Sequence, residues 1–253
     1  MSASLPQLSV LVTARNQAGA LRQLLASLAE QMLPREAWEL VLVDDGSTDA
    51  LAALTHEFEA RLPLRTARQR PAARPVQARL LALYLARGEA ILTLEPDDVA
   101  PPGLLQAHHA FHRLHPEKRA GLAGPLCLVP GSDQTASSVW RSDPILAAAG
   151  RRRRAGPIDL RDCWGARCSV KRAFVVELHG SHHGPVTGGH LLELAARLRA
   201  EKVQVEFSEA AACWSTARLD VAASCRRMSA LGAAAIRIAA ARRKWRLRPW
   251  LGQ

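Results

Sequence analysis

Three short apolar runs, each followed by a polar or acidic turn, constrain the fold of this chain more than any other feature. The runs occupy residues 8–12, 38–43 and 90–94 and consist largely of Val, Leu and Ile. Segments whose apolar residues repeat with a helical period lie between and after them, at 21–31, 51–61, 76–87 and 103–114. Alternating strands and helices joined by short connections predict a parallel sheet covered by helices. We therefore expect an α/β fold with a mostly parallel central sheet flanked by helices.

The second half of the chain has a less regular pattern. We expect a strand over 121–129, a helix over 191–200 and a strand over 203–207, with loops at 65–75 and 131–156. Hydrophobic residues make up 48% of the 253 residues, which is enough for a sizeable core. From residue 221 onward the chain is basic, Ala-rich and helical in pattern. The sequence therefore predicts one α/β domain over residues 1–217 and a basic amphipathic helical tail over 218–253.

The turns that follow the three apolar runs are the expected binding site, because open parallel sheets bind ligands beyond the carboxyl ends of their strands. These turns are Thr13-Ala14-Arg15-Asn16, Asp44-Asp45-Gly46-Ser47 and Glu95-Pro96-Asp97-Asp98. Acidic side chains gathered at one edge repel each other, and a divalent cation bridging a diphosphate would relieve that repulsion. Oxygen ligands suit Mg²⁺ or Mn²⁺. Either acidic turn alone could simply cap a helix, but two of them, each after a buried strand, favour a ligand site.

These segments resemble family 2 glycosyltransferases. Residues 8–50 are similar to the opening of that family, from the first strand through the Asn16 turn to Val43-Asp44-Asp45-Gly46-Ser47-Thr48-Asp49. Residues 87–115 resemble the segment around the family's acidic metal motif, and 164–172 and 188–214 resemble its acceptor half. The resemblance implies a GT-A fold and transfer of a sugar from a nucleoside diphosphate to an acceptor hydroxyl, with inversion. The implied acceptor is a glycan or a lipid-linked molecule, in cell-surface polysaccharide or glycolipid synthesis.

The resemblance also implies a role for each matching position. The nucleotide pocket would be lined by Thr13, Ala14, Arg15 and Asn16, and the base or ribose would contact Asp45 and Asp44. The metal acids, for Mg²⁺ or Mn²⁺, would be Glu95, Asp97 and Asp98. A base or phosphate contact would come from Arg74 or Arg79, although the simpler reading of both is as ordinary arginines on a solvated face.

Two positions depart from the family pattern. Glu95 stands where an Asp is usual, which keeps a carboxylate but lengthens it by one methylene. The Glu-Asp pair that normally follows a Gly-rich loop, and whose Asp is the general base, is replaced by His190 and Leu191. A neutral imidazole can accept a proton near neutral pH, so His190 is the first candidate for the base and Glu193 the second. The alternative is a catalytically impaired protein that binds a nucleotide sugar or a partner glycosyltransferase.

Charge and cysteine content bear on the partners and the compartment. The net charge is +11, and residues 218–248 hold nine Lys or Arg against one acid, Asp220. A basic helix of this kind can lie on an anionic membrane surface or pack on the domain. Nucleic acid is an unlikely partner, since the chain has one Tyr and little aromatic interleaving.

The five cysteines show no metal-binding spacing, and no secretory leader or membrane span is expected. We therefore expect a cytoplasmic protein, on the inner face of the membrane where the tail attaches. Heavy use of Ala and Arg is typical of a GC-rich genome. We expect a bacterial protein.

Overall fold

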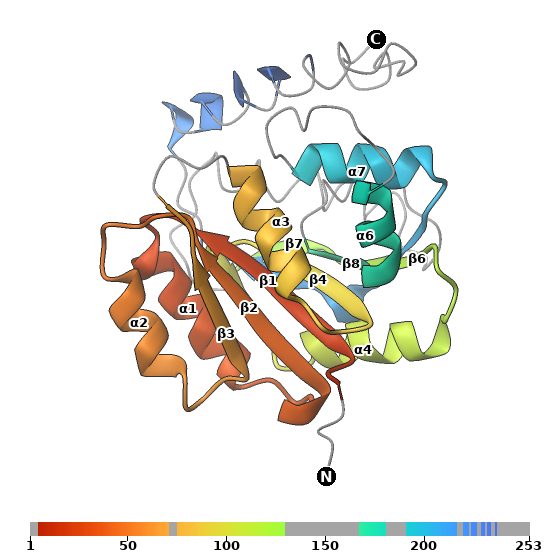
Figure 1. Cartoon of the computed structure of the whole chain (residues 1–253), viewed down its shortest axis with the longest axis horizontal. Coiled ribbons are helices and arrows are strands. Elements are labelled where there is room, and N and C mark those ends of the chain that lie inside the picture. The colour runs from red at the N-terminus through yellow and green to blue at the C-terminus, as the bar shows by residue number, and fades with distance from the viewer. Residues whose placement is uncertain are drawn as a thin grey trace.

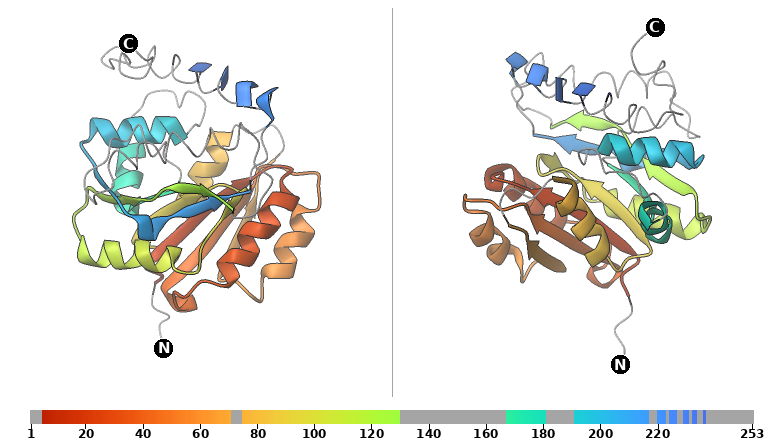
Figure 2. Two further views of the ribbon diagram at one scale, coloured as in Figure 1. Left: turned by 180° about the vertical axis from the view of Figure 1, so that it is seen from behind. Right: turned by 45° about the horizontal axis from the view of Figure 1, so that its top comes forward.

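The central feature of the structure, a computed structural model, is a sheet that carries helices on both faces (Figure 1; Figure 2). The structure describes residues 5–70, 75–129, 167–180 and 191–216, and from the tail 220–222, 224–226, 229–230, 232–233 and 236. Within these residues the sheet has seven strands, and a second sheet has three. The fold is therefore α/β with a mostly parallel central sheet, as the sequence predicted.

The central sheet has the strand order β3-β2-β1-β4-β8-β6-β9. Its strands are β1 (Leu8–Ala14), β2 (Trp38–Asp44), β3 (Leu64–Arg68), β4 (Ala90–Leu94), β6 (Ala120–Ala123), β8 (Cys168–Lys171) and β9 (Gln204–Phe207). β8 is antiparallel to both of its neighbours, β4 and β6, and the other pairs are parallel. The second sheet has the order β5-β10-β7 and contains β5 (Asp98–Val99), β7 (Leu126–Leu128) and β10 (Cys213–Ser215).

Two hydrophobic cores sandwich the central sheet. The described α-helices are α1 (Ala18–Ala29), α2 (Leu51–Phe58), α3 (Pro75–Leu85), α4 (Leu104–Leu114), α6 (Arg172–Gly180) and α7 (Leu191–Ala200), with 3-10 helices η1 (Arg35–Ala37) and η2 (Glu209–Ala211). One core joins β1 residues such as Val10 to α1, α2 and α4, and the other joins Leu11 to α3, α6 and α7. β1 and β2 are thus covered on both faces, which explains their nearly continuous apolar sequence.

Two local expectations differ from the structure. The segment expected as a loop from residue 65 begins with strand β3, which pairs in parallel with β2 from Leu64 to Arg68. β3 is an edge strand, where charged residues are tolerated because one side is unpaired. The single strand expected over 121–129 is divided between β6 and β7. Gly124 lies at the break. A Cβ there would stand only 2.0 Å from the Ala211 carbonyl oxygen, so the chain can pass this close to η2 only because residue 124 has no side chain.

The tail is described only in part. Its described positions from 220 to 236 include helical residues, with Val221 and Ile236 exposed. Residues 218–219 and 237–253 lie outside the described residues. Among the helices of the described part, none combines the length and the apolar character needed to cross a membrane. The division at residue 217 stays a prediction.

Candidate functional site

Three turns meet at one edge of the central sheet, after β1, β2 and β4. The register pairs Ala14 with Asp44 and Val12 with Leu94, so the three strands end side by side. The chain passes from β1 to β2 on one side and later to β4 on the other. The strand order therefore reverses at β1, and such a switch point is where open α/β sheets bind ligands.

The turns after β1 and β2 are tied together by hydrogen bonds. The Asn16 backbone N–H donates to Ser47 Oγ at 3.0 Å, and Asn16 Oδ1 accepts from the Thr48 N–H at 2.7 Å. The Asp45 N–H donates to the Ala14 carbonyl at 2.9 Å. Asn16 has φ of 52°, a left-handed conformation that Asn tolerates better than most residues. Through its backbone N–H and its side-chain oxygen, Asn16 therefore links the turn after β1 to the turn after β2.

The two acids of the second turn have different partners. Asp44 Oδ1 accepts from the Ser47 N–H at 2.7 Å, and Asp44 Oδ2 lies 3.5 Å from Arg68 Nε. Asp45 is also buried, and its Oδ1 accepts from Gln69 Nε2. Arg68 further donates from Nη2 to the Ser47 carbonyl at 2.7 Å. Arg68 and Gln69 were missed in the sequence because β3 was read as a loop, and the end of a strand is the signal that would have found them.

The third turn folds around the carboxylate of Asp98. Asp98 Oδ2 accepts from the Glu95 N–H at 2.8 Å, and the Asp98 N–H donates to the Glu95 carbonyl at 3.0 Å. Asp98 is 0% exposed, whereas Glu95 and Asp97, two residues apart, are half-buried. A ligand can therefore reach the outer pair, Glu95 and Asp97, but not Asp98.

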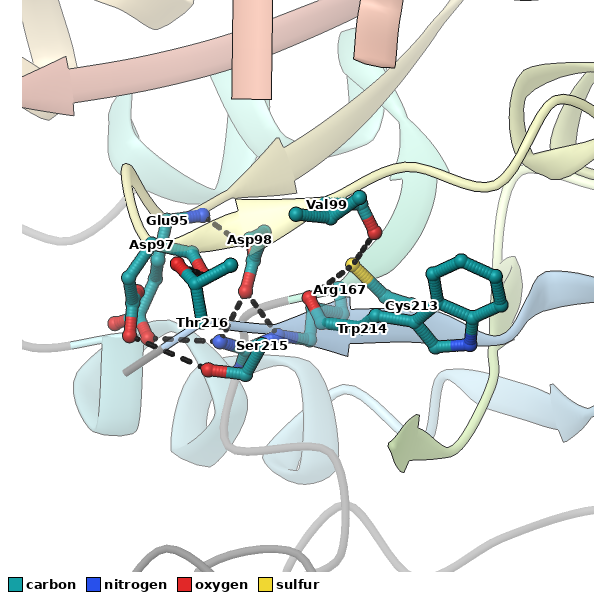
Figure 3. Close-up of polar contacts among 9 residues, drawn as sticks. All are labelled: Glu95, Asp97, Asp98, Val99, Arg167, Cys213, Trp214, Ser215 and Thr216. Carbon is teal, nitrogen blue, oxygen red and sulfur yellow. Dashed lines mark hydrogen bonds and ion pairs between the residues drawn. The ribbon is translucent and has the colours of Figure 1, made fainter. Parts of the chain in front are cut away.

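A buried arginine enters this acidic turn from a distant part of the chain (Figure 3). Arg167 donates to Asp98 Oδ1 from Nε at 2.8 Å and from Nη2 at 2.5 Å, and Nη2 also lies 3.0 Å from Glu95 Oε2. Its backbone N–H donates to the Thr93 carbonyl at 2.7 Å, and its φ is 55°. Arg167 was missed in the sequence, because it lies 69 residues from Asp98 and no local pattern marks it.

The charges in the turn act on one another strongly. Burial raises the pKa of the Asp98 carboxyl to about 7, against the attraction of the Arg167 guanidinium, and the nearby Asp97 and Glu95 carboxylates raise it as well. Burial disfavours the charge of Arg167, but Asp98 and Glu95 outweigh it and raise the pKa of the guanidinium. Burial also raises the pKa of the neighbouring Cys213 thiol well above its ordinary value. The turn is therefore a compact ion cluster with little water around its inner members.

Strand β10 of the second sheet also contacts this turn (Figure 3). Thr216 donates to the Asp97 carbonyl from its backbone N–H at 2.9 Å and from Oγ1 at 3.1 Å. Ser215 Oγ lies 3.5 Å from Asp97 Oδ2. β5 and β10 pair across the same place, with Asp98 opposite Ser215. Residues late in the chain thus fix the position of Asp97.

The fit of a divalent cation follows from these contacts. No group of three His, Cys, Asp or Glu side chains in the described part of the chain is arranged to hold a metal ion. Both oxygens of Asp98 have partners inside the turn, and the side chain of Glu95 is 18% exposed. Mg²⁺ usually takes one or two protein carboxylates and completes its shell with water and substrate phosphates. Glu95 and Asp97 fit a cation shared with a diphosphate, whereas the turn does not form a closed protein site.

The other expected site residues lie as follows. At the end of β1, Thr13 is half-buried, Ala14 is buried and Arg15 is exposed. Arg79 lies half-buried on α3. Glu193 is in the first turn of α7, but its side chain is not among those described. Arg74 and His190 lie outside the described residues.

Comparison with known proteins agrees with this geometry. The family model described as "Glycosyl transferase family 2" matches residues 9–170. The poly(ribitol-phosphate) beta-N-acetylglucosaminyltransferase TarS of Staphylococcus aureus, from strains Mu50 and MW2, is 33% identical over 104 residues. That match covers 41% of this chain and 18% of TarS, so it spans about a fifth of the relative's length.

Solved structures of S. aureus TarS residues 1–349 have the same fold. The complex with UDP-GlcNAc aligns with a TM-score of 0.68 at 20% identity, covering 92% of this chain and 66% of that one. The complex with UDP aligns with a TM-score of 0.67 at 18% identity, covering 93% and 65%. At this level of identity the likeness establishes the GT-A fold alone. The family match spans more than half of the sequence, and the chain therefore belongs to glycosyl transferase family 2.

Proposed function

We propose that this chain transfers a sugar from a nucleoside diphosphate to an acceptor hydroxyl, with inversion at the anomeric carbon. The observation that carries the proposal is the meeting of three turns where the strand order reverses, with buried Asp45 beside β1 and half-buried Glu95 and Asp97 after β4. Asp45 suits the polar edge of a base or ribose, and Glu95 and Asp97 suit a cation on a diphosphate. Membership in the family supports the same reading.

The donor we propose is a uridine diphosphate sugar. TarS, whose structures contain UDP and UDP-GlcNAc, shares the fold. Asp45 would accept a hydrogen bond from the base or ribose, with Gln69 holding its carboxylate in place. The turn from Thr13 to Asn16 would line the same pocket, and Arg79 on α3 or Arg74 would meet the base or the phosphates.

The leaving diphosphate carries charge that must be neutralised as the bond to the sugar breaks. Mg²⁺ or Mn²⁺, when bound, would supply that neutralisation as a Lewis acid. Asp97 and Glu95 would hold the cation from the protein side. Asp98 would support the turn from within, since its oxygens bond to Arg167 and to the Glu95 N–H.

The acceptor proton needs a base, and we propose His190 for this role, with Glu193 second. The acceptor would be a hydroxyl of a glycan or a lipid-linked molecule of the cell surface. TarS is named as a poly(ribitol-phosphate) beta-N-acetylglucosaminyltransferase, which supports a polymer as the acceptor of this chain. The tail, residues 218–253, would hold the protein on the anionic inner face of the membrane, in the cytoplasm.

A second candidate is a protein that binds a nucleotide sugar, or a partner glycosyltransferase, without turnover. The observation that favours it is Leu191, which stands where the family carries its carboxylate base and cannot accept a proton.

The test of the two candidates combines binding with turnover. Thermal shift with a panel of nucleoside diphosphate sugars, with and without Mn²⁺, identifies a donor, because a ligand that binds only the native state raises its Tm. Turnover is then measured for the wild type, His190→Ala and Glu193→Gln. An active enzyme with His190 as base loses kcat in His190→Ala and keeps its donor affinity. Donor binding with no turnover on any glycan or lipid-linked acceptor favours the second candidate. The absence of any stabilising nucleotide sugar refutes the proposed transfer and leaves only a protein that binds a partner glycosyltransferase.

A further inference from the structure

Asp45 is a buried acid with one carboxylate oxygen to spare. The residue is 4% exposed, and its Oδ1 accepts a hydrogen bond from Gln69 Nε2. Its Oδ2 has no hydrogen-bond partner among the residues that the structure describes. A carboxylate oxygen that is withdrawn from water without a donor is costly. Asp45 therefore suits a ligand that brings an N–H or an O–H to Oδ2.

Gln69 is fixed beside this oxygen by its backbone and by its side chain. Its backbone N–H donates to the Asp44 carbonyl at 2.9 Å, so the pairing of β3 with β2 continues past the end of the strand. The amide must turn its nitrogen towards Asp45, because a carboxylate accepts hydrogen bonds. Within the described part of the chain, the second N–H of Gln69 and its Oε1 have no partner. Half-buried Gln69 thus offers one donor and one acceptor next to Asp45.

Both side chains lie on the face of the sheet that α3 covers. Val43 belongs to the core shared with α3, and side chains alternate along a strand. Asp45, two residues later, still bonds to β1 like a strand residue, since its N–H donates to the Ala14 carbonyl. It therefore points to the same side as Val43, and its contact with Gln69 places that residue there as well.

The place of this pair along the sheet favours contact with a nucleobase. β2 is separated by β1 from β4, and β3 is the edge strand beyond β2 (Figure 1). Two strand spacings, roughly 10 Å, thus separate Asp45 from the turn with Glu95 and Asp97. If the donor diphosphate lies at that turn, a ribose fills the distance and the base reaches Asp45 and Gln69.

The pair complements a ring N–H that stands beside a carbonyl. The N–H would donate to Asp45 Oδ2, and the carbonyl would accept from Gln69 Nε2. Uracil carries this pattern at N3 with either of its carbonyls, and guanine carries it at N1. Cytosine and adenine present a lone pair at the corresponding ring nitrogen, which would repel a carboxylate.

We propose that Gln69 is a base-selecting residue, which donates to the carbonyl beside the ring N–H that Asp45 accepts. This inference rests on the proposed function, in which the donor is a uridine diphosphate sugar. It assigns Gln69 a contact with the substrate, in addition to its hold on Asp45. The site then takes uracil and rejects cytosine, a pyrimidine of the same size.

The experiment is calorimetry on the full chain with UDP, 2-thio-UDP and 4-thio-UDP, because a thiocarbonyl is a weak acceptor. In the wild type, one of the two thio nucleotides should bind roughly five- to tenfold more weakly than UDP, as expected for one hydrogen bond. In Gln69→Ala, UDP itself should bind more weakly by a similar factor, and the penalty of that thio substitution should disappear. Thr66→Val, at an exposed position of the same strand, should keep the wild-type penalty.

A purely supporting role for Gln69 gives a different result. If the amide only positions Asp45, Gln69→Ala weakens all three nucleotides equally and the thio penalty stays, which would overturn the inference. The wild type provides a test that does not depend on the folding of a variant. It should bind UDP at least about tenfold more tightly than CDP, since CDP loses a hydrogen bond to Asp45. Equal binding of UDP, CDP and both thio nucleotides would show that the pair does not read the base.

The proposed function can fail separately from this inference. A chain with Gln69-dependent selectivity for UDP that transfers no sugar is a binder without turnover, and the role of Gln69 stands. A chain that transfers sugar from a cytidine or adenosine donor keeps the reaction and refutes the role of Gln69. If none of UDP, CDP, GDP and ADP binds, with or without Mn²⁺, both are refuted.

Discussion

Two histidines buried against the central sheet should make the fold sensitive to mild acid. His108 and His112 lie one turn apart on α4, and both contact Ser169 Oγ on β8, from His108 Nδ1 at 2.7 Å and from His112 Nε2 at 2.8 Å. The other ring nitrogens, His108 Nε2 and His112 Nδ1, have no hydrogen-bond partner within the described residues. Burial lowers the pKa of each imidazole to about 3, and for His112 the charge of Lys171 contributes as well.

The sign and size of the effect follow from linkage. Both pKa values are below the unfolded value of about 6.5, so the stabilisation is fully present above that pH and is lost as the pH falls. Between pH 7.5 and pH 5 the unfolded chain takes up a proton at each histidine and the folded chain does not. The loss is about 2 kcal/mol per histidine, or about 4 kcal/mol for the pair. Total stabilities are typically about 5–15 kcal/mol, so the effect is readily measurable.

The assay is urea unfolding at about pH 7.5, 6.5, 5.5 and 5, which bracket the pKa of about 6.5 that the histidines have in the unfolded chain. It compares the wild type with His108→Asn/His112→Gln, in which amides stand near the bonding nitrogens but do not titrate. The double variant should lose about 4 kcal/mol less than the wild type between the extremes.

The raised pKa of Asp98 acts in the opposite direction, but it is present in both proteins and cancels in the difference. His56→Gln, at a side chain 86% exposed, controls for loss of a histidine at the surface. Equal losses in the wild type and the double variant would refute the reasoning.

Three further predictions concern the pocket, the packing and the tail. Asp45→Ala should weaken binding of the donor nucleotide by about 1–3 kcal/mol in calorimetry. Gln69→Ala should weaken it less, and unchanged affinity in Asp45→Ala would place the base elsewhere. Gly124→Ala should lower the free energy of unfolding by about 1–3 kcal/mol or more, because the added Cβ would meet the Ala211 carbonyl at 2.0 Å, and wild-type stability in a urea titration would contradict this. Deleting residues 218–253 should abolish salt-sensitive binding to anionic liposomes, since each basic group near such a surface contributes about 1 kcal/mol, and full retention in a flotation assay would show that the tail is not the anchor.

The sequence by itself determined the strands and the turns of the donor half. Strands buried on both faces must be apolar along their whole length, so β1, β2 and β4 were visible as continuous runs before Asn16, Asp45 and Glu95. Parallel strands end at a common edge, and that rule alone predicted that the three turns would meet. β3 was not predicted as a strand, because an edge strand needs few apolar residues. Arg68 and Gln69 at its end were therefore not identified as site residues.

Only the tertiary structure decided what the acids of the third turn do. Glu95, Asp97 and Asp98 cannot be told apart in the sequence. In the fold Asp98 is 0% exposed and accepts two hydrogen bonds from Arg167, whereas Glu95 is half-buried and accepts one. Arg167 enters because β8 is inserted antiparallel beside β4, and β10 then closes on Asp97 from the second sheet. These partners come from segments 69 to 119 residues away. Such contacts are set by the packing of whole elements, and no periodicity or spacing near residue 95 carries information about them.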